Sequence, residues 1–88
     1  SAASDVYKRQ QWYNAGNYAS AEKEILNFID QSTPYAYWLA RSFILLSDVY
    51  VAMDKKLDAR QYLLSLQQNY QADDDIASMI NERLEKLK

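Results

Sequence analysis

Cysteine and histidine are both absent from the 88 residues of this chain. Without cysteine there is no disulfide, thiolate metal ligand or thiol nucleophile, and without histidine the commonest general base and metal ligand are missing. A single glycine also leaves no glycine-rich loop that could hold a phosphate. We therefore expect a protein that is not an enzyme and that uses no cofactor and no metal.

Glycine and proline occur once each, although the tight turns of a sheet protein usually depend on these residues. Their scarcity favours long helices joined by short connections. The composition therefore predicts an all-α fold.

Neither charge nor hydropathy is extreme. Ten basic and twelve acidic residues give a net charge of −2, which offers no electrostatic attraction to nucleic acid.

No stretch approaches 18 uninterrupted apolar residues, so we expect no membrane insertion. The first residues lack the basic start and apolar run of a signal peptide, and the compartment stays open between cell envelope and cytoplasm.

Hydrophobic periodicity and punctuation predict five helices, at about 4–15, 19–31, 34–53, 57–70 and 73–87. Ser4 is the expected N-cap of the first helix. Ser32-Thr33-Pro34 predicts a hydroxyl cap followed by proline at the first position of the third helix. Asp73 is expected to cap the fifth helix, because acidic residues stabilise a helix N-terminus more often than an Asp triplet binds metal. The third helix is apolar on nearly all sides, which indicates a central position.

An internal repeat with an offset of 38 residues relates the second helix to the fourth. The offset places Ala21 on Ala59 and Ile25 on Leu63. The chain then consists of two helical hairpins, each with a first (A) and a second (B) helix, and one closing helix. The predicted core is centred on Leu46, Tyr50, Ala59 and Leu63.

The motif Phe43-x-x-Leu46-Ser47-x-x-Tyr50, followed by the small residue Ala59, resembles the tetratricopeptide repeat (TPR) family. The segments 33–43 and 73–76 resemble the C-terminal end of large bacterial proteins with many such repeats. The resemblance implies a right-handed stack of helical hairpins. One repeat would span about 4–33, a second about 34–72, and a capping helix about 73–88.

The first ten residues allow two interpretations. They resemble a peptide that arises when sequencing-adapter DNA is translated at the edge of a truncated reading frame, which would make segment 1–10 non-native. Alternatively, they are a divergent first helix of a domain whose TPR-like part spans 11–88. Asp5, Lys8 and Arg9 stand where the family has apolar or small residues.

The candidate binding residues come from two sources. Counting from the TPR motif places Arg41, Ile44, Asp48 and Val51 on the concave groove where the family binds partners. Tyr13 and Tyr37 are further contact candidates, because tyrosine is enriched at interfaces. Four other aromatic residues are expected in the core: Trp12, Trp38, Tyr50 and Tyr70. Members that bind chaperone tails hold a carboxylate with several cations, whereas this groove offers Arg41 beside acidic Asp48, so such a ligand is not expected.

Two functions fit these features. The first is a non-catalytic scaffold for protein–protein interaction, the terminal TPR unit of a longer solenoid, with a protein or peptide partner. The second is an architectural cap or self-association module that seals adjacent repeats, with a weak homodimer formed through the N-terminal helices. The sequence does not identify the partner.

Overall fold

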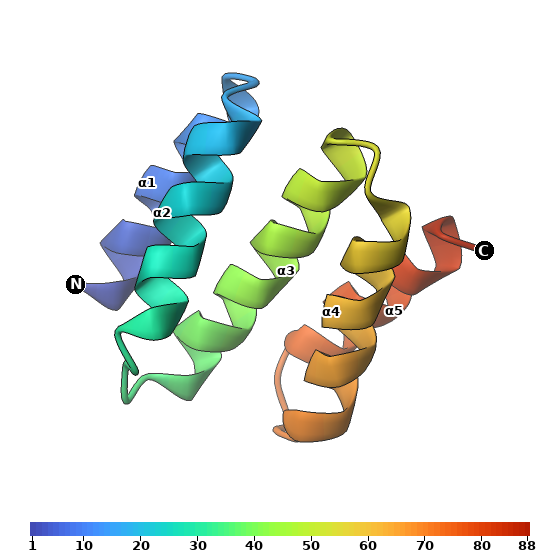
Figure 1. Ribbon diagram of the computed structural model, residues 1–88. Helices are drawn as coiled ribbons and strands as arrows, with labels where there is room; N and C mark the ends of the chain where they lie inside the picture. Colours follow the sequence, from blue (N-terminus) through green and yellow to red (C-terminus); the bar gives the residue numbers. More distant parts are fainter.

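Five α-helices make up the fold (Figure 1), α1 (Ala2–Asn14), α2 (Tyr18–Asp30), α3 (Ala36–Ala52), α4 (Lys56–Asn69) and α5 (Ile76–Lys86). The computed structural model describes residues 1–88, apart from the side chain of residue 2. The described residues form no strand. The predicted all-α class with five helices is thus confirmed.

The central helix is α3, and each of the other four helices packs against it. Its buried residues lie on several sides: Ala40, Ser42, Ile44, Leu45, Leu46, Ser47, Val49 and Tyr50. A helix that is apolar nearly all round needs neighbours on more than one face, and here α1 and α2 cover one side while α4 and α5 cover another (Figure 1).

Two predicted helix starts were wrong at the N-terminal end and in the middle of the chain. The N-cap of α1 is Ser1, whose hydroxyl accepts the Ser4 N–H while the Ser4 hydroxyl accepts the Ser1 N–H. This capping box begins the helix earlier than expected. The Thr33 hydroxyl accepts the Tyr35 N–H at 3.2 Å. This local turn holds Pro34 outside α3, which begins at Ala36.

The start of α5 also differs from the prediction. Asp75, not Asp73, occupies the N-cap position, and the Asp74 carboxylate accepts the Ile76 N–H at 2.9 Å. Tyr70 donates its hydroxyl to the same Asp74 carboxylate, which raises the pKa of Tyr70 to about 12. These acidic residues therefore fix the α4–α5 connection.

The two hairpins repeat with the 38-residue offset. α1 ends at Asn14 and α3 at Ala52, while α2 begins at Tyr18 and α4 at Lys56. Each turn contains one residue with positive φ, +80° at Gly16 and +59° at Asp54. The hydrogen bonds across the turns match as well: Asn17 N–H to the Trp12 carbonyl at 2.9 Å, and Lys55 N–H to the Tyr50 carbonyl at 2.7 Å.

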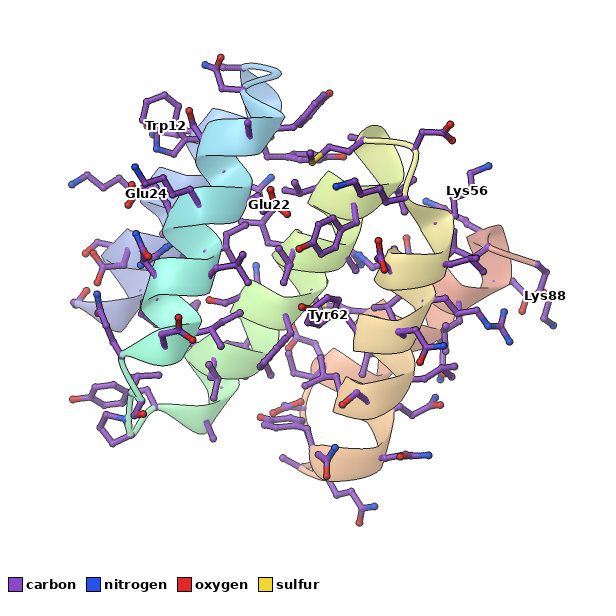
Figure 2. All side chains as sticks on the ribbon, viewed as in Figure 1. Trp12, Glu22, Glu24, Lys56, Tyr62 and Lys88 are labelled. Atoms are coloured by element: carbon purple, nitrogen blue, oxygen red, sulfur yellow. The ribbon has the colours of Figure 1, made fainter. Side chains whose placement is uncertain are left out.

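The predicted core is confirmed, since Leu46, Tyr50, Ala59 and Leu63 are all buried. Trp12 was placed wrongly, because its side chain is 42% exposed. Tyr50, its counterpart on α3, contacts Glu22 of α2 and Tyr62 of α4, which lie on either side. Trp12 instead lies at the edge of the molecule (Figure 2). Trp38 and Tyr70 are half-buried.

The first ten residues pack onto the rest of the fold. Val6 is buried, and the Arg9 guanidinium lies 4.1 Å from the centroid of the Phe28 ring. Arg9 Nε also donates to the Glu24 carbonyl at 3.1 Å. α1 therefore has an inner face with contacts to α2 and an outer face that is exposed.

Within the part of the chain that the structure describes, no helix combines the length and the apolar character needed to cross a membrane.

Candidate partner-binding site

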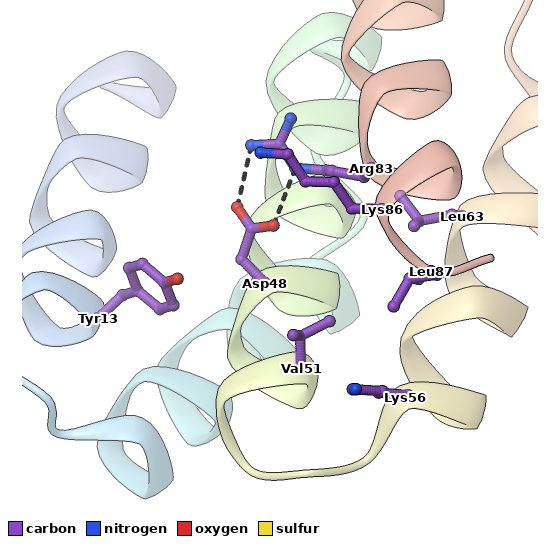
Figure 3. Close-up of a pocket in the computed structure, with 8 residues that line it drawn as sticks. All are labelled: Tyr13, Asp48, Val51, Lys56, Leu63, Arg83, Lys86 and Leu87. Atoms are coloured by element: carbon purple, nitrogen blue, oxygen red, sulfur yellow. Dashed lines mark hydrogen bonds and ion pairs between the residues drawn. The ribbon is translucent and has the colours of Figure 1, made fainter.

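A pocket of about 320 Å³ lies where α1, α3, α4 and α5 meet (Figure 3). α3 contributes Asp48 and Val51 to it, and α1 contributes Tyr13. The remaining lining residues come from α4, α5 and the residue after α5: Lys56, Leu63, Arg83, Lys86 and Leu87. Because α3 packs against both α1 and α5, these three helices bring together residues far apart in the sequence.

One wall of the pocket is an ion pair between α3 and α5. Arg83 Nε lies 2.8 Å from Asp48 Oδ1, and Arg83 Nη2 lies 3.0 Å from Asp48 Oδ2. Arg83 Nη1 donates to the Met79 carbonyl at 3.2 Å. Burial alone would lower the pKa of Arg83, but the hydrogen bonds to Asp48 outweigh this effect and raise it. Such a bidentate pair holds the planar guanidinium in one orientation and fixes α5 on α3.

Two further cations border the pocket. Lys86 Nζ lies 4.0 Å from Glu82 Oε1, and both side chains are largely exposed, which makes this a weak pair. Lys56 has no ion-pair partner within 4.0 Å among the described residues. Figure 3 shows Lys56 near Val51 and Leu87, and Lys86 beside Arg83. The only carboxylate among the lining residues is Asp48, which Arg83 already occupies, so the pocket is positively charged although the whole chain has a charge of −2.

Tyr13 faces the ion pair from α1. Burial and the nearby Asp48 carboxylate raise the pKa of Tyr13. Like any protonated tyrosine, its hydroxyl can donate a hydrogen bond. Its ring centroid lies 5.7 Å from that of Tyr18 on α2, in a tilted arrangement that orients the side chain. Tyr13 therefore adds both apolar surface and a polar group to the wall opposite α5.

The structure brings together three of the six predicted site residues, Tyr13, Asp48 and Val51. The placement of Ile44 in a groove was wrong, because its side chain is 1% exposed. Ile44 belongs to a buried cluster with Ile76 and Ile80 of α5. That helix covers this part of the α3 face, which the motif alone would leave open.

Arg41 and Tyr37 lie near the start of α3, outside the pocket. Arg41 Nη1 donates to the Tyr37 hydroxyl at 3.0 Å, and that hydroxyl donates to Asp75 Oδ1 at 2.9 Å. Asp75 is the N-cap residue of α5. The two residues therefore brace the beginning of α5 against α3 and are not available in the pocket as free contacts.

None of the lining residues of α4 and α5, Arg83 among them, was predicted from the sequence as a site residue. A signal for Arg83 was present, since it lies between Ile80 and Leu87 at the three- and four-residue spacing of a buried helix face. An arginine on such a face needs a carboxylate partner, and Asp48 supplies it.

No protein-family model matches this chain, and no curated protein or solved structure matches it.

Proposed function

We propose that this protein is a TPR-like, non-catalytic interaction scaffold that binds a peptide segment of another protein on the surface formed by α1, α3 and α5. The observation that carries the proposal is the pocket where these helices meet α4 and where apolar, hydroxyl and cationic side chains converge. The matching turns and helix bounds of the two hairpins support the helical-repeat character. The chain has neither cysteine nor histidine, which supports a binding role over catalysis.

The charge of the pocket indicates the kind of segment that it binds. Among the described residues, Lys56 has no ion-pair partner within 4.0 Å and Lys86 has only a weak one. Apolar surface lies next to these cations, supplied by Val51, Leu63 and Leu87. An acidic side chain flanked by an aliphatic or aromatic one would satisfy both parts of the pocket. Such an interaction weakens as ionic strength rises, because the contributing charges are exposed.

A peptide-display selection on the immobilised full chain tests the proposal. We expect enrichment of peptides in which an acidic residue neighbours an apolar one. The affinity of a fluorescently labelled selected peptide is then measured by anisotropy. Replacing both cations, in the double variant Lys56→Glu/Lys86→Glu, should weaken binding by about tenfold or more, since two attractive contacts become repulsive.

The matched control is Lys23→Glu/Lys55→Glu, which reverses two exposed lysines that do not line the pocket. This control should bind the selected peptide with nearly the affinity of the unmodified chain. Equal losses in both double variants would indicate a non-specific charge effect, and a selection without acidic enrichment would contradict the proposed partner chemistry.

A further inference from the structure

The outer face of α1 corresponds to a face that α3 uses for packing. Six exposed residues at helical spacing form this face, which we term the outer stripe: Ser4, Tyr7, Lys8, Gln11, Trp12 and Ala15. The residues 38 positions later are buried or half-buried on α3: Ser42, Leu45, Leu46, Val49, Tyr50 and Met53. On α3 this face is covered by α2 and α4, whereas α1 packs against α2 and α3 with the outer stripe left open.

The outer stripe has the composition of an interface. Tyr7 is 64% exposed and Trp12 is 42% exposed, and Lys8 is the only charged residue among the six. Interfaces are enriched in aromatic residues. A hollow of about 360 Å³ also opens on this face, lined by Lys8, Gln11, Trp12, Ala15 and Asn17.

The order of residues along the outer stripe is symmetric. It runs small, aromatic, polar, polar, aromatic, small, from Ser4 to Ala15. When two copies of such a helix pack antiparallel about a twofold axis between residues 9 and 10, Tyr7 lies opposite Trp12 of the other copy. Lys8 then lies opposite Gln11, and the two Lys8 residues, three positions out of register, are offset by about 4.5 Å along the helix axes. A twofold contact requires this kind of self-complementary surface.

We propose that the outer stripe is the site where a second copy of this chain docks, forming an antiparallel α1–α1 dimer. The Tyr7 ring of each copy enters the hollow beside Trp12 of the other, and the aromatic pairs provide most of the attraction. The inference is independent of peptide binding, because Tyr13 faces the pocket while Trp12 faces outward on the same helix.

The dimer is expected to be weak. The outer stripe is about 16 Å long at 1.5 Å per residue, so a single pair of helices buries less than the roughly 1,200 Å² of a standard stable interface. We therefore expect association in concentrated solution and largely monomeric protein in dilute solution.

Cysteine cross-linking tests both the partner and the register, because the chain has no native cysteine. In the antiparallel arrangement Ser4 lies opposite Ala15, whereas two copies of the same residue are separated by about 16 Å along the axis. A mixture of Ser4→Cys and Ala15→Cys chains should form a disulfide-linked dimer under mild oxidation, because a disulfide needs Cα atoms within about 7 Å. Each variant oxidised alone should remain largely uncrosslinked.

Sedimentation at rising concentration of the unmodified chain provides the second test. Trp12→Glu and Tyr7→Glu should abolish concentration-dependent association, since each places two carboxylates in the interface. The control is Leu57→Glu on α4, whose side chain is 80% exposed and lies outside the outer stripe. Circular dichroism establishes that all three variants remain helical.

Three outcomes overturn the proposal. A chain that stays monomeric at every concentration has no such dimer, and cross-linking of Ser4→Cys alone indicates a different register. Loss of association in Leu57→Glu but not in Trp12→Glu places the contact on another surface.

Discussion

α1 and α3 occupy equivalent positions in the two hairpins but bury very different amounts of their surface. Both end in the same turn geometry, and both are followed by a helix that begins after the same interval. α3 has eight buried residues, whereas Val6 is the only buried residue among the described side chains of α1. The difference follows from position, since α3 lies between α1 and α2 on one side and α4 and α5 on the other, whereas α1 lies at one edge.

Residue choice follows this difference in position. Leu46 on α3 is fully buried, and Lys8 stands at the equivalent position of α1, where it is exposed. Tyr50 and Trp12 form a second pair of this kind, but here both residues are large and aromatic. The backbone repeat is therefore regular, while the burial of equivalent side chains depends on whether a neighbouring helix covers them.

The largest effect on stability is expected at the equivalent positions Leu46 and Lys8. Leu46→Ala should lower the free energy of unfolding by about 2–5 kcal/mol, because it leaves a cavity where α2, α3 and α4 meet. Lys8→Ala should change it by less than about 0.5 kcal/mol, since the side chain is exposed. Urea unfolding of both variants measures the difference. Similar costs at the two positions would show that α1 is more buried than the structure indicates.

The second helices of the two hairpins, α2 and α4, differ from the first helices, because their equivalent positions are equally buried. Ala21 on α2 and Ala59 on α4 are both completely inaccessible and belong to one cluster. Ala21→Leu and Ala59→Leu should each cost about 1–3 kcal/mol through overpacking. Thermal unfolding monitored by circular dichroism provides the measurement.

A suitable control for these variants is Ala19→Leu, which adds the same side chain at an exposed position of α2. It should leave the stability nearly unchanged. A variant at Ala21 or Ala59 that unfolds at the temperature of this control would contradict close approach of the helices at that position.

Much of the fold could be predicted from the sequence, because hydrophobic spacing and the scarcity of glycine and proline are strong signals in a helical chain. The helix starts were less predictable. Ser1, Thr33 and Asp74 all use side-chain oxygens to bond nearby backbone N–H groups, and several neighbouring residues could have done the same. The choice among them depends on how the connected helices pack.

The candidate site was predicted in part. Asp48 and Val51 followed from the motif, but the contribution of α5 depends on how that helix rotates onto α3, which no local pattern specifies. The same rotation buries Ile44 and brings Arg83 to Asp48. Tyr37 was a contact candidate by residue type and Arg41 by its position in the motif, yet Tyr37 bonds Asp75 at the start of α5 and Arg41 bonds Tyr37.

The smallest expected effects concern the two turns, where equivalent positions carry different residues. Gly16 has φ +80°, and a Cβ added there would meet no atom within 4 Å. The loss of stability in Gly16→Ala therefore measures the strain of the backbone conformation without a steric clash. We expect a loss of about 1 kcal/mol in unfolding free energy. Gly16→Asn should cost less, because asparagine tolerates the left-handed region. The equivalent position of the second turn carries Asp54, whose φ of +59° is already unfavourable for a residue with a side chain.

Asp54→Gly should therefore stabilise the fold by a few tenths of a kcal/mol, since the relief of backbone strain exceeds the added conformational entropy of the unfolded chain. Urea unfolding of the three variants in parallel measures the expected losses of stability at Gly16 and the expected gain at Asp54. A loss of stability in Asp54→Gly would show that the aspartate side chain, and not the backbone alone, holds the second turn.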